Sequence, residues 1–338
     1  MPDKTVQMPK LTNAIKLKIK EWYGIDIDSD LFSPMVDYVF KRIFTADDAR
    51  SKIALLDLLN SVLELEGTGR IVDFVVINPE ISVDAKTHKK AVFDIRVKFG
   101  DGRQAIVEMQ LSGAESFKKR AQFIISKSYS SQEISGEDYG MLQKCYLICI
   151  INFTLLRTPS ELVMNYRFRD KDGRELTDDE TILFIQLPEV DKILDKPVET
   201  MTPHEMWSIF FRYISDKSKR NKLEEIIDRK EGIKMAMDVL YEISQDEKIR
   251  IQYENELIYE LDVRSRISEG REEGRAEGIA IGTEKGIAIG TEKGRAEGFN
   301  TALLVYNALK AQVPVDEIAI RYGLPIEQIE SIKSTSSN

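Results

Sequence analysis

The sequence has little of the side-chain chemistry on which many enzymes depend. Its 338 residues include only two cysteines, Cys145 and Cys149, and two histidines. The cysteines stand four apart on one expected strand and cannot bridge each other, so we expect buried packing groups. Two histidines are too few for a zinc site of the usual His and Cys type. Any catalysis must therefore use carboxylates and a metal that prefers oxygen ligands.

Long apolar runs are also missing. The longest, residues 146–156, contains Asn152 and Thr154 and is too short to cross a bilayer, so we expect a buried strand and no membrane partner. The first twenty residues lack an apolar segment of the secretory type, which favours a cytoplasmic protein. With 42% apolar and 8% aromatic residues, the chain has the composition of a globular protein with one sizeable α/β core and a second helical region.

Acidic residues exceed basic ones, but unevenly. The formal net charge is −9 at pH 7. Residues 1–150 carry 21 Lys/Arg and 21 Asp/Glu and are neutral overall. Residues 151–338 carry 27 Lys/Arg and 36 Asp/Glu, so the whole net negative charge lies in this part of the chain. A neutral first half is compatible with DNA binding, because local basic clusters matter more than the total charge. The acidic second half is a poor surface for nucleic acid and suits protein partners better.

Two expected strands carry the most informative residues. Asp94 lies in the segment VFDIRVKF, and Glu108 and Gln110 lie in QAIVEMQL, with a Gly-Asp-Gly turn between the two segments. A three-residue loop pairs Phe99 with Arg103 and, counting back, places Asp94 directly opposite Glu108. Because side chains alternate along a strand, Glu108 and Gln110 share one face.

Opposed carboxylates on neighbouring strands repel each other, and an ordinary sheet avoids them. They make sense if a cation lies between them. Mg²⁺ takes one or two protein carboxylates and completes its coordination with water and phosphate oxygens, so this pair predicts a Mg²⁺ (or Mn²⁺) site. The alternative for Glu108 is a surface residue on an edge strand.

The surrounding pattern predicts a mixed sheet flanked by helices. Apolar spacing and β-branched content predict helices over 35–66, 114–135 and 222–244 and further strands over 71–80, 144–153 and 180–190. The run at 144–153 is typical of a strand covered on both faces. From about residue 190 the chain turns mostly helical.

A glycine stands at every fourth position from 270 to 298. Each glycine costs a helix about 1 kcal/mol relative to alanine. The segment is either a flexible or partly helical tether, or a helix whose bare stripe lets a second copy approach and form a homo-oligomer. The last segment predicts two short helices broken at residues 323–325. Their spacing is similar to a helix-turn-helix, but the second helix is acidic, which favours a cap or oligomerisation element over DNA reading.

The residues Asp94, Glu108 and Gln110, with Asp37 in SPMVDYVFKRIF, resemble the PD-(D/E)XK nuclease superfamily. More narrowly, the chain resembles the recombination-promoting nuclease and transposase family. Arg120 and Tyr129, which follow the third strand, also match. The resemblance covers about residues 33–155, with a looser likeness in the glycine repeat. Gln110 departs from the lysine that is more usual in the superfamily, although glutamine is familiar in the narrower family.

The resemblance implies a restriction-endonuclease-like α/β core and roles for particular residues. Asp94 and Glu108 would be metal ligands, with the Met109 carbonyl as a third, and Gln110 would orient the attacking water or a phosphate oxygen. Asp37 would contact the groups that bind the metal, or it would be linked to the metal itself. The resemblance also implies that DNA is the partner. We expect the residues that contact DNA to be Arg120, Tyr129 and two neighbouring lysines, Lys118 and Lys119.

Several of these residues keep a structural alternative. Asp37 could be a solvated helix carboxylate beside Lys41. Arg120 suits phosphate geometry but could instead form a surface ion pair with Glu115 or Glu133. Tyr129 could pack against the core or hydrogen-bond a phosphate of the DNA backbone.

We divide the chain into an N-terminal extension (1–32), a nuclease-like domain (33–190), a helical region (191–268), the glycine repeat (269–299) and a C-terminal helical hairpin (300–338). The function that the resemblance implies is a metal-dependent DNA endonuclease that is transposase-like and promotes recombination. The alternative is a catalytically weak protein of the same fold that acts as an interaction or regulatory module.

Overall fold

The computed structural model describes residues 11–77, 80–84, 89–113, 116–132, 138–156 and 161–335. The chain forms two compact units, which divide between Arg264 and Ser265. One helix, α8 (Glu247–Lys310), begins in the first unit and continues into the second. Among the helices of the described ranges, none combines the length and the apolar composition that crossing a bilayer requires.

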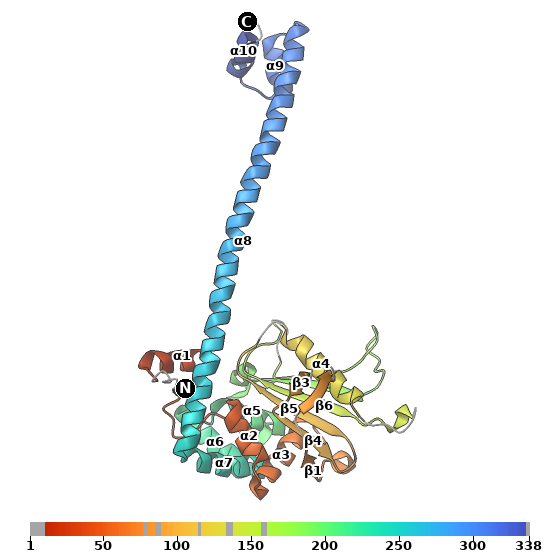
Figure 1. Ribbon diagram of the computed structural model, residues 1–338, viewed down its shortest axis with the longest axis vertical. Helices are drawn as coiled ribbons and strands as arrows, with labels where there is room; N and C mark the ends of the chain where they lie inside the picture. The colour runs from red at the N-terminus through yellow and green to blue at the C-terminus, as the bar shows by residue number, and fades with distance from the viewer. Residues whose placement is uncertain are drawn as a thin grey trace, which may run out of the picture. The chain divides into compact units, whose positions relative to one another are not determined.

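A six-stranded mixed sheet forms the centre of the first unit (Figure 1). Its spatial order is β1-β4-β5-β6-β8-β7, with the bounds β1 Phe74–Val76, β4 Ile95–Phe99, β5 Gln104–Gln110, β6 Cys145–Ile151, β7 Val163–Tyr166 and β8 Glu180–Gln186. The neighbours β5, β6 and β8 run parallel, whereas the pairs β1–β4, β4–β5 and β7–β8 are antiparallel. A separate two-stranded sheet pairs β2 (Glu80–Asp84) with β3 (Lys89–Val92).

Strand β6 lies at the centre of the sheet because its sequence, CYLICII, is apolar on both faces. Ile148 and Ile150 point into the larger hydrophobic core, and Leu147 and Cys149 point into a smaller one on the other face. Both cysteines are buried and unbridged, as predicted.

Helices cover both faces of the sheet (Figure 1). Helix α4 (Phe117–Ser130) covers the smaller core. The larger core is enclosed by a group of helices that pack against one another, namely α1 Asn13–Tyr23, α2 Asp37–Thr45, α3 Ala49–Val62, α5 Pro203–Tyr213, α6 Arg220–Arg229, α7 Glu231–Ser244 and the first turns of α8. Short 3₁₀ turns complete the unit at η1 Gly67–Gly69, η2 Tyr139–Met141, η3 Leu187–Ile193, η4 Val198–Thr200 and η5 Lys217–Lys219.

The predicted fold class, a mixed sheet flanked by helices with a long helical C-terminal region, is confirmed. The helix over 114–135 and the strands over 144–153 and 180–190 are confirmed as α4, β6 and β8, with shorter bounds. The expected helical segment 35–66 contains two helices, α2 and α3. Strands β2, β3 and β7 were not predicted, because each has only four or five residues and lacks a long apolar run.

The single helix predicted over 222–244 is wrong. The structure breaks it at Lys230, whose extended backbone (φ −127°, ψ 98°) ends α6 and starts α7. A partly buried contact explains the break. The Lys230 ammonium donates to Asp57 Oδ1 at 2.8 Å, and Gly232 packs so closely on Asp57 that an added Cβ would lie 2.3 Å from the Asp57 Cβ. Fitting α7 against α3 therefore overrides the continuous helical periodicity.

In the second unit, α8 continues as a helix through all eight glycines of the repeat. Apart from the chain neighbours and the backbone of the helix itself, nothing lies within 4 Å of the position where a Cβ would stand on any of these glycines. The segment is therefore helical, and the approach of a second copy to its bare stripe stays a prediction. The end of α8 packs with α9 (Val315–Tyr322) and α10 (Ile326–Thr335) around a small core that includes Val305, Ile318 and Ile329. The predicted break between the last two helices is confirmed, with Gly323 at φ 64° as the C-cap.

Candidate active site

The predicted register of the two central strands is confirmed. The Phe99 N–H donates to the Arg103 carbonyl at 2.8 Å across the Gly-Asp-Gly turn. Ile95 pairs with Val107, so the same register places Asp94 opposite Glu108. The turn length and the apolar alternation both fix this register, because a slip of one residue would move all the apolar side chains to the wrong face of the sheet.

The ladder between β4 and β5 ends at Asp94. The Met109 N–H points toward β4, and it donates to Asp94 Oδ2 at 2.8 Å. The Asp94 N–H in turn lies 3.4 Å from Glu108 Oε1. In a strand, the N–H and C=O of one residue point to the same side. The Met109 carbonyl is therefore directed to the side on which the Asp94 carboxylate lies.

Glu108 is almost completely buried, with 1% of its side chain exposed. Its Oε2 accepts from Arg120 Nη2 at 3.1 Å and lies 3.5 Å from Gln110 Nε2. Since β5 is a central strand, the alternative of a surface residue on an edge strand is wrong for Glu108. Arg120 forms its ion pair with this predicted metal ligand. The two surface partners considered for Arg120, Glu115 and Glu133, lie outside the described residues.

Helix α2 brings Asp37 to the same place. Lys41 Nζ lies 2.7 Å from Asp37 Oδ2 and 3.3 Å from Asp94 Oδ1, so one ammonium joins the two carboxylates. The second oxygen of Asp37 is buried, and no group of the described residues hydrogen-bonds to it. From the sequence, Lys41 was only a helix neighbour of Asp37. Its contact with Asp94 depends on how α2 packs on the sheet, and no local pattern indicates it.

Two of these carboxyl groups are difficult to ionise in the folded protein. Burial and then the charge of Asp37 raise the pKa of Asp94 to about 6, although Lys41 and the hydrogen bond from the Met109 N–H oppose the shift. Burial and the charge of Asp94 raise the pKa of Glu108 to about 8, against the opposing effect of Arg120. Burial works against the charge on Lys41, but its contacts with Asp37 and Asp94 raise its pKa overall. Burial is the largest cause of both raised carboxyl pKa values, and the neighbouring cations Lys41 and Arg120 oppose it only in part.

A cavity of about 320 Å³ opens at this end of the sheet. Asp37, Asp94 and Gln110 line one side of it, and Glu256, Tyr259 and Glu260 of α8 line the other. Glu256 accepts from the Tyr38 N–H at 3.2 Å, and burial followed by the charge of Asp37 raises the pKa of Glu256 to about 7. The residues of α8 were missed from the sequence, since they lie far along the chain and form no motif with the others.

The donor set suits an oxygen-seeking divalent cation. Among the described residues, no three His, Cys, Asp or Glu side chains are grouped so that they could enclose a metal. Mg²⁺ does not need such an enclosure, because one or two carboxylates with water and phosphate oxygens are sufficient. Asp94, Glu108 and the Met109 carbonyl are the groups that would hold it. The raised pKa values of Asp94 and Glu108 fit this assignment, since a cation would favour the ionised forms.

Three predicted DNA-contacting residues lie away from the carboxylates. The Tyr129 hydroxyl donates to Asp179 at 3.2 Å, close to the start of β8 and toward the opposite end of the parallel strands from Glu108. The ring of Tyr129 packs against the smaller core. Lys119 is exposed on α4, and Lys118 lines a different cavity.

The family of the chain follows from comparison with known proteins. The comparison with curated proteins and the comparison with solved structures each gave no match. A family model for the PD-(D/E)XK nuclease family transposases matches residues 34–270. That span includes the sheet, all the site residues described above and the first turns of α8. With the carboxylates of Asp94 and Glu108 side by side at the end of two central strands, the chain belongs to the PD-(D/E)XK nuclease family transposases.

Proposed function

We propose that the protein is a DNA endonuclease that hydrolyses phosphodiester bonds with Mg²⁺ or Mn²⁺ and acts in recombination or transposon-like rearrangement. The observation that carries the proposal is the pairing of Asp94 and Glu108. Both are desolvated, they face each other across two strands, and each has a raised pKa. Such a pair is unfavourable in a sheet unless it serves to bind a cation.

Each residue then has a distinct task. Asp94, Glu108 and the Met109 carbonyl hold the cation. When bound, the cation polarises a phosphoryl oxygen and lowers the pKa of water. Gln110 lines the cavity and can donate a hydrogen bond that orients the attacking water. Arg120 keeps half of its side chain exposed while it bonds Glu108, so further N–H groups can donate to a DNA phosphate.

Lys41 supplies the positive charge that Gln110 cannot. A lysine at position 110 would place an ammonium next to the carboxylates, and here the Lys41 ammonium lies 3.3 Å from Asp94 Oδ1. It comes from α2 instead of β5. In this position it can stabilise negative charge that develops on the phosphate during hydrolysis.

The same contacts favour a second candidate function. Lys41 already bridges Asp37 and Asp94, and Arg120 already pairs with Glu108, so among the described residues two cations of the protein itself already contact these carboxylates. A protein that offsets its carboxylates in this way could be a weak catalyst and act through its helical region as an interaction module. The two candidates differ in whether added Mg²⁺ produces cleavage.

The test is nicking of supercoiled plasmid by the full chain in Mg²⁺ or Mn²⁺. The isosteric variants Asp94→Asn and Glu108→Gln should each abolish nicking. Asp73→Asn serves as the matched control, because Asp73 is an exposed carboxylate paired with Lys52 near β1. Equal nicking by all four proteins, or none by the wild type, would remove the endonuclease and leave the interaction module.

A further inference from the structure

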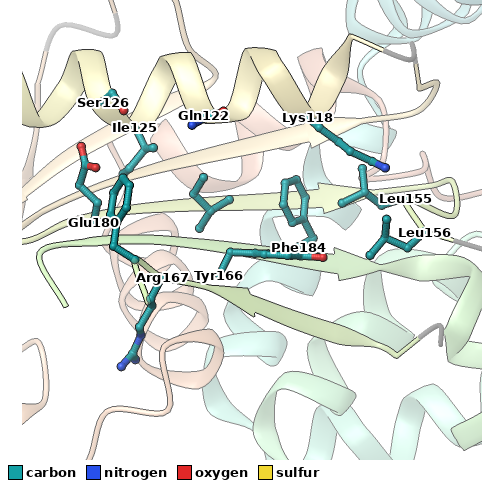
Figure 2. Close-up of a pocket in the computed structure, with 12 residues that line it drawn as sticks. Lys118, Gln122, Ile125, Ser126, Leu155, Leu156, Tyr166, Arg167, Glu180 and Phe184 are labelled. Atoms are coloured by element: carbon teal, nitrogen blue, oxygen red, sulfur yellow. The ribbon is translucent and has the colours of Figure 1, made fainter. Parts of the chain in front are cut away.

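Helix α4 separates the carboxylate site from a second cavity. On one flank of α4, Arg120 reaches Glu108. On the other flank, Lys118, Gln122 and Ser126 lie over a cavity of about 360 Å³ between α4 and the strands β7 and β8 (Figure 2). Its volume is within the range of small-molecule sites in proteins. The proposed function makes no use of this cavity.

The walls of the cavity are mainly aromatic and aliphatic. Phe184 of β8 is buried, and the ring of Tyr166 meets it edge to face with centroids 5.7 Å apart. Phe168 also lines the cavity but leaves 48% of its surface exposed. Leu155 and Leu156 lie at the same end as Lys118 (Figure 2). A half-exposed aromatic ring in the wall of an apolar cavity offers a face on which a flat ring can stack.

A few polar groups converge on these apolar walls. Figure 2 shows the Glu180 carboxylate and the side chains of Gln122 and Ser126 along the same cavity. Burial and then the charge of Asp179 raise the pKa of Glu180. A carboxylate inside the cavity repels phosphate but accepts hydrogen bonds from amino groups. The interior therefore suits an uncharged ring that carries N–H donors and acceptors on its edge.

Positive charge lies at the rim. The first turn of α4 has no acidic residue; its Lys118 lines the cavity and its Lys119 is exposed, whereas Arg120 is paired with Glu108 on the other flank. The N-terminus of a helix adds a partial positive charge in the same place. Arg167 does not contribute, because it pairs with Glu175 at 2.9 Å and points away from the cavity in Figure 2. A ligand that suits both regions has an uncharged flat ring inside the cavity and an anion at the rim. A nucleotide has both, in its base and its phosphate.

We propose that this cavity accepts one unstacked base of a DNA strand whose backbone follows the first turn of α4. The base stacks on Phe168 and Tyr166, and its edge meets Glu180 and Gln122. Because Glu180 accepts, bases with an exocyclic amino group fit better than thymine. The inference rests on the proposed function in taking DNA as the substrate, and it adds that the preferred DNA is locally melted or single-stranded.

The test compares two phenylalanines with the same exposure. Phe168 lines the cavity, whereas Phe123 lies on α4 outside the cavity wall, and each is 48% exposed. Binding of a fluorescent single-stranded cytosine-rich oligonucleotide to the full chain is measured by anisotropy in EDTA, so that no cleavage occurs. Phe168→Ala should weaken binding about 5- to 150-fold, the range found when a base-stacking aromatic is replaced. Phe123→Ala should bind as the wild type does.

A second pair of measurements addresses the base itself. An oligonucleotide with 2-aminopurine in place of one base should change its fluorescence on binding to the wild type and less on binding to Phe168→Ala. Glu180→Gln should reduce the preference for cytosine over thymine oligonucleotides. The inference is overturned if the wild type binds duplex and single strand equally, or if Phe168→Ala and Phe123→Ala behave alike.

The outcome also separates this inference from the proposed function. If the wild type nicks plasmid but the two phenylalanine variants bind alike, the base site is excluded and the endonuclease stands. If the wild type does not nick plasmid but Phe168→Ala alone loses binding, the endonuclease is excluded and the base site stands.

Discussion

Replacing Glu108 by glutamine should make the metal-free protein more stable at high pH while removing its activity. The substitution keeps the shape of the side chain and removes one buried charge. In the wild type, the folded protein holds the Glu108 proton up to a pKa of about 8, whereas the unfolded chain releases it near 4.5. The folded state therefore binds more protons between these values, and the free energy of unfolding falls as the pH rises through them.

The size of the effect follows from the two pKa values. Ionising a carboxyl whose pKa has moved from 4.5 to about 8 costs at most roughly 5 kcal/mol. Glutamine avoids this cost but has one acceptor oxygen where the carboxylate has two. Glu108 accepts from Arg120 through Oε2 and from the Asp94 N–H through Oε1, so about 1 kcal/mol is lost. The net gain for Glu108→Gln is about 3 kcal/mol at pH 8 and close to zero at pH 5.

The assay is urea unfolding of the full chain in EDTA at pH 5 and pH 8, followed by tryptophan fluorescence. Both tryptophans, Trp22 and Trp207, belong to the first unit, so the signal reports the unit that contains the site. Glu66→Gln is the control, because Glu66 is exposed and should show no pH-dependent difference. The reasoning is refuted if Glu108→Gln is less stable than the wild type at pH 8, or if the difference between them is equal at both pH values.

Three further predictions concern the cation, the pH and the long helix. Lys41→Met should increase the Mg²⁺ affinity, measured by calorimetry, about ten-fold, because a competing charge beside Asp94 is removed. The same variant should lower the nicking rate. An unchanged Mg²⁺ affinity would contradict this prediction. Added Mg²⁺ should raise the melting temperature more at pH 8 than at pH 5.5, because protons compete for Asp94 and Glu108 at the lower pH. Equal increases in melting temperature at the two pH values would count against Asp94 and Glu108 as metal ligands. Changing Gly282 and Gly286 to alanine should stabilise α8 by about 1 kcal/mol each, seen as slower amide exchange. If a second copy packs on the glycines, the same change would instead lower the solution mass.

The local part of the site could be predicted from the sequence. A three-residue turn and the alternation of apolar residues on either side of it place Asp94 opposite Glu108, because both signals act over a few residues. The run CYLICII identified the buried central strand for the same reason. Resemblance to a nuclease family then supplied the chemistry, and the family match confirms that membership.

Other parts of the site depend on packing between distant segments. Lys41 reaches Asp94 only because the apolar face of α2 is buried against the sheet. Glu256 joins the same cavity from α8, although some 160 residues separate it from Asp94 along the chain. Spacing and composition describe neighbours along the chain, whereas burial of large apolar surfaces brings segments together whatever their separation. The alternating strands therefore specified the carboxylate pair, and the packing of helices on the sheet specified its cations and the acidic residues across the cavity.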